Sequence, residues 1–293
     1  MEETKKKINI IPVLLDTSTF KSLSKDKLEK YNSENFKIMI SSYTFFELLY
    51  HLDDHLEEDW KKSKGNICKC SSVEILDDPF AIIETELNYQ TKRLKDHVPE
   101  SQLIPEILKC LSNSNSINDF YKSDFIDQKG QRRLIDGCSK GARETLDKEK
   151  NKYLKYIKEI RQCIEQQNYD INSEKDSNKI ITQLIDARIV DTKNNNNQTK
   201  YISDQVFNLC YLYYSYIFER TKQLIIISAE EPDKNDYVDS CICLHLHLDK
   251  PFIFVTNDKG LYEAIKNSTE RLKRFGKSPS KDCNISWGIG INL

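Results

Sequence analysis

The segment Val13-Leu14-Leu15-Asp16-Thr17-Ser18 joins an apolar run to an acidic residue and two hydroxyl side chains, and the fold class is best predicted from it. The run extends back to Ile8 with little interruption, which is typical of a strand buried on both faces of a parallel sheet. Asp16 can also cap a helix that follows it. We therefore predict a strand over residues 8–15 that ends in a carboxylate.

A second unit of the same kind follows. A polar helix or loop is expected over residues 19–35, and Phe36–Ile40 is another short apolar run. Ser41 and Ser42 can then cap a helix whose apolar residues recur at helical spacing. These apolar residues are Phe45, Phe46, Leu48, Leu49, Leu52 and Leu56. The first 59 residues thus predict strand, helix, strand and helix.

The end of the sequence repeats this order. We predict strands at residues 224–228 and 252–255, each followed by a helix, at 236–248 and 260–272 respectively. Apolar and polar residues alternate from Ile285 to Asn292, which predicts one more strand.

The long middle of the chain is polar and has few short apolar runs. Helices are expected at residues 79–97, 101–111, 131–168, 175–190 and 203–222. The segments 112–116 and 193–200 are predicted loops. We therefore expect an α/β domain at 1–59 and 222–293, interrupted by a large helical insertion at 60–221.

Composition limits the class of protein. The 293 residues are 38% hydrophobic and 31% charged, which excludes global disorder, and no apolar stretch is long enough to span a membrane. The formal net charge of −2 excludes a uniformly basic surface. Nine scattered cysteines and no signal-peptide pattern predict reduced thiols and a cytoplasmic protein.

Acidic residues lie just beyond the predicted strands. Asp16 and Asp258 follow strands directly, and Glu47 lies in the first two turns of a helix after a strand. Asp236 and Asp239 begin the helix after residues 224–228. Ligands of open parallel sheets bind at the carboxyl ends of the strands. Clustered carboxylates repel one another, and hard cations such as Mg²⁺ or Mn²⁺ relieve that repulsion.

Three segments together resemble the PIN domain, a family of metal-dependent nucleases. The first is Val13-Leu-Leu-Asp16-Thr17-Ser18-Thr19-Phe20, and the second is Ile38-Met-Ile-Ser41-Ser-Tyr-Thr-Phe-Phe-Glu47. The third begins with Asp236-Tyr-Val-Asp239 and continues at Phe252-Ile-Phe-Val255-Thr256-Asn257-Asp258. The resemblance covers residues 8–59 and 222–293 and leaves the middle unexplained.

The resemblance implies a three-layer α/β fold with a central parallel sheet. It also implies an Mg²⁺- or Mn²⁺-dependent endonuclease, acting on RNA in preference to DNA, in which a metal-activated water attacks the phosphodiester. The implied catalytic metal ligands are Asp16, Glu47, Asp239 and Asp258, with Asp236 as a further ligand. Ser18 and Asn257 would order waters around them.

Other interpretations remain open. The family includes toxins, RNA-processing factors and defence effectors, and a DNA nuclease would use the same centre. Alternatively, the acids are only helix caps, and the chain is a non-catalytic adaptor. The insertion would then bind a protein partner, and it could also receive an antitoxin if the chain is a toxin.

Two basic stretches are candidates for nucleic-acid binding. Residues 271–281 follow the helix that starts at Asp258, so they are predicted to line the rim of the acidic site, and residues 129–161 belong to the insertion. The candidate residues are Arg271, Lys273, Arg274, Lys277, Arg132, Arg133 and Arg143.

Two further patterns favour structural roles. His51, His55, Cys68 and Cys70 are close in sequence, but their spacing matches no usual zinc site. The aromatic segment 207–218 could stack bases, although such a helix is more often part of a core.

Overall fold

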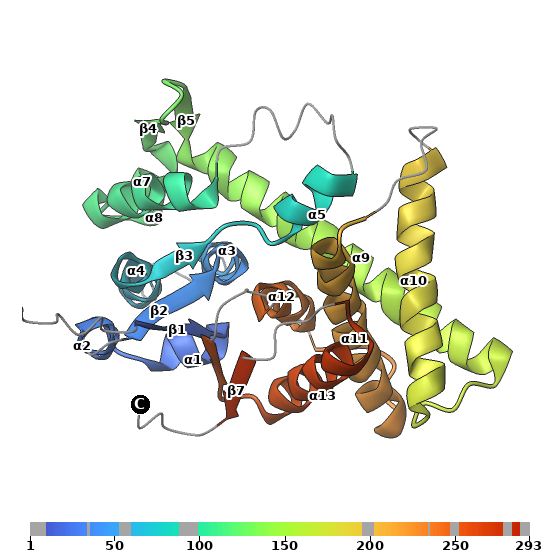
Figure 1. Ribbon diagram of the computed structural model, residues 1–293. Helices are drawn as coiled ribbons and strands as arrows, with labels where there is room; N and C mark the ends of the chain where they lie inside the picture. Colours follow the sequence, from blue (N-terminus) through green and yellow to red (C-terminus); the bar gives the residue numbers. More distant parts are fainter. Residues whose placement is uncertain are drawn as a thin grey trace, which may run out of the picture.

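The computed structural model describes residues 10–33, 36–52, 60–87, 99–194, 202–233, 235–246, 252–277 and 283–287. Among these residues, parallel strands form one sheet in the order β3-β2-β1-β6-β7 (Figure 1). The strands are β1 (Ile11–Leu15), β2 (Phe36–Ser41), β3 (Glu74–Leu76), β6 (Phe252–Thr256) and β7 (Cys283–Trp287). The predicted α/β class with a central parallel sheet is confirmed.

The two faces of the sheet pack against different sets of helices. Leu14 and Phe254 belong to one core, whereas their neighbours Leu15 and Val255 belong to the other. This division follows from the alternation of side chains along a strand. Strands buried on both sides explain why their sequences are almost continuously apolar.

Helices surround the sheet. Before the predicted insertion, the helices are α1 (Thr17–Ser22), α2 (Lys25–Ser33) and α3 (Ser42–Tyr50). In the middle they are α4 (Trp60–Cys68), η2 (Lys69–Ser72), α5 (Phe80–Leu87), α7 (Glu100–Asn113), α8 (Ile117–Lys122), α9 (Ile135–Gln167), α10 (Glu174–Asn194) and α11 (Asp204–Ile226). After it come α12 (Asp236–Ile242), the 3₁₀ turn η3 (Cys243–Leu246) and α13 (Lys259–Phe275).

The middle segment packs directly on the sheet. Helix α9 has 33 residues and crosses the molecule diagonally, passing α3 and α12 (Figure 1). Leu146 and Tyr153 of α9 share a core with Leu14 of β1. Helix α11 is buried almost throughout, including Tyr211, Tyr213, Tyr214, Tyr216 and Phe218. The aromatic segment is therefore core, as predicted. Both cores contain residues from the ends and from the middle of the chain, and the division into two domains stays a prediction.

One predicted strand is wrong. Residues 224–226 are the last turn of α11, and the backbone of Ile227 continues its hydrogen bonding to Gln223. The side chains of Ile226 and Ile227 are 63% and 70% exposed, so this apolar run has no sheet to enter. The helix already running through residues 204–223 prevails over the strand preference of consecutive isoleucines, because that preference depends on packing context.

The other predicted elements agree with the structure within a few residues. Strand β3 and the hairpin of β4 (Asp124–Ile126) with β5 (Arg132–Leu134) were not predicted, because each has only three residues. The predictions at residues 8–9, 56, 88–97, 195–200, 247–248 and 288–292 lie outside the described residues. In the described residues, no helix is both long and apolar enough to cross a membrane.

Candidate acidic site at the edge of the sheet

Strand register brings three polar residues to one edge. Leu15 of β1 lies opposite Ile40 of β2 on one side and Val255 of β6 on the other. The next residue on each strand is therefore Asp16, Ser41 or Thr256, at the carboxyl edge of the sheet. In open parallel sheets this is the edge at which ligands bind.

Asp16 is buried and held by three donors. Its Oδ1 accepts the backbone N–H of Thr19 at 2.9 Å, so it caps α1. Its Oδ2 accepts the hydroxyls of Ser18 at 2.7 Å and Thr256 at 2.9 Å. Ser18 thus contacts the acid that it was predicted to support, and the orientation of Asp16 is fixed.

Glu47 faces Asp16 from helix α3. Its side chain is buried, and its Oε1 accepts Nδ2 of Asn235 at 2.9 Å and lies 3.8 Å from Nζ of Lys21. Burial raises the pKa of Glu47 and Asp16 raises it further, while Lys21 lowers it. Glu47 is therefore a desolvated acid beside a second acid.

Asp239 is the least compensated carboxylate of the site. Burial raises its pKa well above the usual range, the charges of Asp16, Glu47 and Asp236 add to this effect, and the positive charge of Arg220 opposes it. Its side-chain oxygens accept no hydrogen bond and form no ion pair within the described part of the chain. In contrast, Asp236 forms an ion pair with Arg220 of α11, and both side chains are nearly buried. The two acids of α12 therefore have different environments.

Asp258 lies farther out. It is exposed and caps α13, with Oδ1 accepting the backbone N–H of Leu261 at 2.8 Å. Its own backbone N–H donates to the Thr256 hydroxyl at 3.0 Å. The next-door Asn257 donates its backbone N–H to Thr19, and its buried Oδ1 has no hydrogen-bond partner among the described residues. The structure thus groups Asp16, Glu47, Asp236 and Asp239, with Asp258 connected to them through Thr256.

The donors suit a hard divalent cation in chemistry and charge. Asp16, Glu47 and Asp239 supply carboxylate oxygens, the ligands that Mg²⁺ and Mn²⁺ prefer. Burial and, after it, repulsion from the neighbouring acids raise the pKa of Asp239, and a bound cation would relieve that repulsion. No three His, Cys, Asp or Glu side chains of the described ranges are already arranged as a set of metal ligands. The acids are therefore near one another without forming a closed ligand shell.

Several residues of this site were not anticipated. Thr256 could have been found, because it ends a predicted strand. Lys21, Asn235 and Arg220 lie in a helix, a turn and the end of the insertion, and nothing in their local sequence indicates a contact with the acids.

The basic residues near the end of α13 do not line the site. Arg271 was predicted to bind nucleic acid at the rim of the acidic site, but it is buried, donates to Ser215 and pairs with Glu219. A helix rises about 1.5 Å per residue, which places Arg271 roughly 20 Å from Asp258 along α13. The others contact other groups: Lys273 approaches Glu270, Arg274 pairs with Glu174, and Lys277 lies over the Phe207 ring.

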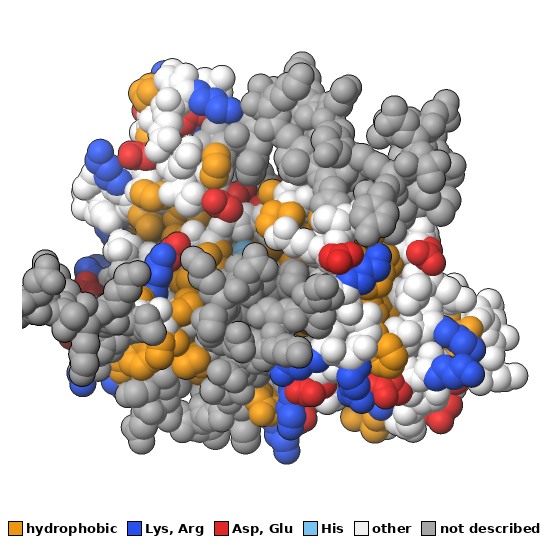
Figure 2. Space-filling model, in the orientation of Figure 1, with side chains coloured by type: hydrophobic (Ala, Val, Ile, Leu, Met, Phe, Trp, Pro, Cys, Tyr) orange, Lys and Arg blue, Asp and Glu red, His pale blue; other side chains and the backbone are white. Residues whose placement is uncertain are grey.

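The basic residues of the insertion also have acidic partners. Arg132 pairs with Asp124, and Arg133 pairs with Asp127, while Arg143 is partly buried on α9. On the face shown in Figure 2, the Lys and Arg side chains are interspersed with Asp and Glu. That face therefore presents no continuous basic surface in its described part.

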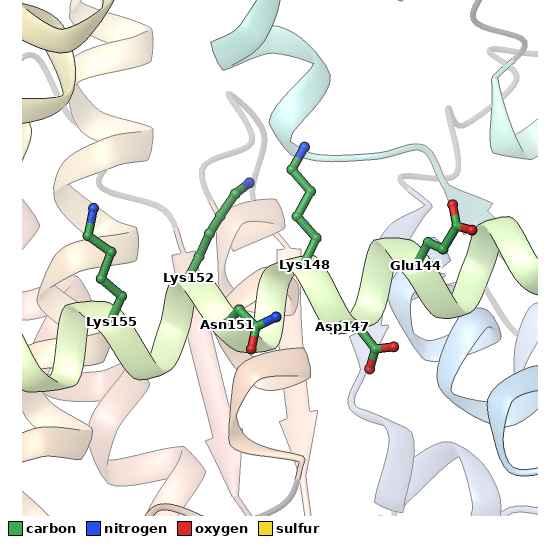
Figure 3. A pocket seen from close by; sticks show the side chains of 6 residues that line it. All are labelled: Glu144, Asp147, Lys148, Asn151, Lys152 and Lys155. Atoms are coloured by element: carbon green, nitrogen blue, oxygen red, sulfur yellow. The ribbon is translucent and has the colours of Figure 1, made fainter.

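Farther along α9, lysines line a shallow pocket of about 560 Å³ (Figure 3). Lys148, Lys152 and Lys155 project from the same side of the helix, whereas Asp147 projects from the opposite side. Lys152 pairs with Glu149 at 2.6 Å, and Lys155 approaches Glu159 at 3.6 Å. Burial raises the pKa of Tyr237, and the charges of Glu47 and Asp147 raise it further, so Tyr237 is near an acid of the site and near an acid of α9. These lysines are therefore carried by a helix that runs beside the acids.

The possible zinc residues do not form a site in the described chain. Cys70 is buried, where burial raises its thiol pKa, and His55 lies outside the described residues. Lys69, between the two cysteines, donates to the carbonyls of Lys21 and Leu23 and so closes the end of α1. This segment has a structural role.

Comparisons with known proteins found no matching family model, no matching curated protein and no matching solved structure.

Proposed function

We propose that this chain is a divalent-cation-dependent endonuclease of the PIN type that cleaves RNA. The observation that carries the proposal is Asp239, a carboxylate that accepts no hydrogen bond within the described residues and whose pKa is raised by burial and by the charges of Asp16 and Glu47, beside the carboxyl edge of a parallel sheet. The order of the three sequence segments supports it, and the preference for RNA comes from that resemblance alone.

In this proposal each acid has a defined role. Asp16, Glu47 and Asp239 hold Mg²⁺ or Mn²⁺, and Asp258 lies at the exposed rim of the acidic site. The cation would neutralise phosphate charge and lower the pKa of water, the chemistry that such ions supply in nucleases. Thr256 and Ser18 keep Asp16 oriented through their hydroxyls. Asn235 and Lys21 hold Glu47.

The test is cleavage of single-stranded RNA and DNA with Mg²⁺, Mn²⁺ or EDTA. Asp239→Asn removes one charge at nearly constant volume and should reduce cleavage at least 100-fold. Asp204→Asn, an exposed acid at the start of α11, is the matched control and should cleave like the wild type. RNA products should carry 5′-phosphates. Equal cleavage by wild type and Asp239→Asn would contradict the proposal.

A second candidate is a non-catalytic adaptor, favoured by the absence of a preformed metal-ligand set in the described residues and by the capping roles of Asp16 and Asp258. Thermal unfolding separates the two. A nuclease should gain stability with Mn²⁺, and Asp239→Asn should gain less, because a ligand that binds only the folded state stabilises it. An adaptor should show no Mn²⁺ shift in either protein.

A further inference from the structure

Two neighbouring isoleucines at the end of α11 are explained neither by the fold nor by the acidic site. Ile226 and Ile227 are 63% and 70% exposed, which makes them the most exposed large apolar side chains of the described residues. They follow Leu224, whose side chain is buried. Scattered single apolar residues are normal on a protein surface, whereas adjacent ones that form a patch indicate a surface for association.

The backbone holds these two isoleucines in a fixed position. The N–H of Ser228 donates to the carbonyl of Ile225 at 3.1 Å, and the N–H of Ala229 donates to that of Leu224 at 2.9 Å. These are the two hydrogen bonds of a Schellman helix end. Ser228 has a φ of +55°, the left-handed conformation that glycine adopts more easily. Arg161 of α9 closes the turn by donating to the carbonyl of Ala229 at 2.6 Å. The isoleucines therefore belong to a rigid turn, and a rigid surface loses little entropy on binding.

A hollow lies directly beside the isoleucines. It has a volume of about 290 Å³, the liquid volume of roughly ten water molecules, and can receive a branched side chain. Its apolar lining comes from α9 and from the end of α11, and consists of Ile164, Leu224, Ile225 and Ala229. The chain therefore presents an apolar projection and an apolar hollow next to each other on one surface.

Charged residues of both signs surround this surface. Glu165 and Glu230 line the hollow. Lys222 lies one helical turn before Ile226, on the same face of α11. Within the described ranges, none of these three charged side chains forms an ion pair. A surface that carries both signs is complementary to its own copy, because a two-fold axis can place each charge opposite the other sign. A uniformly basic or acidic partner would match only one of them.

We infer that this surface binds a second copy of the chain through a two-fold interface. Ile226 and Ile227 of each copy enter the hollow of the other copy. Lys222 of each copy faces Glu230 of the other. A two-fold interface requires one surface that is complementary to itself, and a projection beside a hollow meets that requirement. None of these residues belongs to the acidic site, so the inference does not depend on the proposed function. The apolar patch is small, and we therefore expect a weak dimer with a Kd of about 1–100 µM.

Sedimentation velocity of the full chain between about 1 and 300 µM tests the inference, because this range brackets the expected Kd. The wild type should change from monomer to dimer across it. Ile227→Asp should raise the Kd of the dimer at least about 100-fold, since a carboxylate would have to enter an apolar hollow. Ile126→Asp changes an isoleucine of β4 that is 62% exposed, and it should dimerise like the wild type. A wild type that stays monomeric would assign the surface to a different partner and overturn the inference, as would an Ile227→Asp variant that dimerises normally.

Charge exchange tests the arrangement of the two copies. Lys222→Glu should raise the Kd about tenfold, because it places two acids opposite each other. Lys222→Glu/Glu230→Lys should return the Kd to within about threefold of the wild type, because each charge again meets its opposite. A purely structural effect of Lys222→Glu would lower the melting temperature of the dilute monomer and would not be reversed by the exchange. A double variant that dimerises no better than Lys222→Glu would overturn the two-fold arrangement.

Discussion

The hydroxyl of Thr256 donates a hydrogen bond to Oδ2 of Asp16 at 2.9 Å, although 240 residues separate the two in sequence. The hydroxyl oxygen of Thr256 in turn accepts a hydrogen bond from the backbone N–H of Asp258 at 3.0 Å. One buried hydroxyl therefore connects the acid that follows β1 with the acid that begins α13. Its position depends on the register between β1 and β6.

Replacing this hydroxyl should destabilise the protein. Thr256→Val keeps the shape and removes two hydrogen bonds, the one that Thr256 donates to Asp16 and the one that it accepts from the backbone of Asp258, so we expect a loss of about 1–3 kcal/mol in unfolding free energy. Urea denaturation in EDTA measures it. Thr256→Ser retains the hydroxyl and should be the milder change. A Ser variant as unstable as the Val variant would show that the methyl group matters more than the hydrogen bonds.

His245 should make the protein sensitive to acid. Burial lowers its pKa to about 4, and its Nε2 lies 3.0 Å from Oγ of Ser41. The unfolded chain has a histidine pKa near 6.5, so protonation favours unfolding as pH falls below that value. The contribution should reach about 3 kcal/mol by pH 4.

Denaturation curves between pH 7 and pH 4 isolate this effect when wild type is compared with His245→Gln. The variant should lose less stability across that interval. Asp78 acts in the opposite sense, because burial raises its pKa to about 6 and its protonation favours the folded state. Asp78→Asn should therefore lose stability more steeply than wild type. Parallel curves for wild type and His245→Gln would contradict the prediction.

Arg271 should be important for stability and not for RNA binding. Its buried pair with Glu219 means that Arg271→Gln leaves an unpaired carboxylate, at a cost of about 3–5 kcal/mol. The double variant Arg271→Met/Glu219→Leu should recover most of the loss. Lys273→Gln, two residues away and exposed, should change stability by less than about 0.5 kcal/mol. The measurement is again the unfolding free energy, and similar values for the two single variants would contradict the assignment.

RNA affinity should depend on α9. Replacing Lys148, Lys152 and Lys155 by Gln should weaken binding of single-stranded RNA in EDTA and reduce the magnitude of its log–log salt slope by up to about 3, roughly one per lost contact. The matched triple variant of Lys273, Arg274 and Lys277 removes the same charge far from the acids and should leave the slope unchanged. A larger change of the salt slope in the second triple variant would support the prediction that residues 271–277 bind RNA. No change of the slope in either variant would favour the non-catalytic adaptor.

The strands that meet at the acids could be predicted because each is buried on both faces. Burial on both faces produces the apolar runs before Asp16 and Thr256, and it leaves polar residues only where the strand ends. The run at Leu224 is equally apolar in sequence, yet it is the end of a helix. A short apolar run does not distinguish the two structures, since only the surrounding contacts decide between them.

Charge partners could not be predicted in the same way. Arg271 belongs to a basic stretch, but it pairs with Glu219 of another helix. Arg220 of α11 reaches Asp236 of α12 across the turn between these helices, and no periodic pattern in the sequence predicts that contact. Long side chains pair through tertiary structure, so a count of charges along the chain cannot tell a surface residue from a buried one.

The pairing of β1 with β6 has a consequence for synthesis of the chain. Val13 of β1 pairs with Ile253 of β6. The central strand β1 therefore has only one neighbouring strand until about 240 further residues have been synthesised. Such non-local pairing is slow to form, and a growing chain holds β1 with one edge open until residues 252–256 leave the ribosome. Asp16 and Glu47 are made early, but Thr256 and the acids of α12 arrive late. The acidic site is therefore incomplete until β6 has been synthesised, more than 200 residues after Asp16 and Glu47.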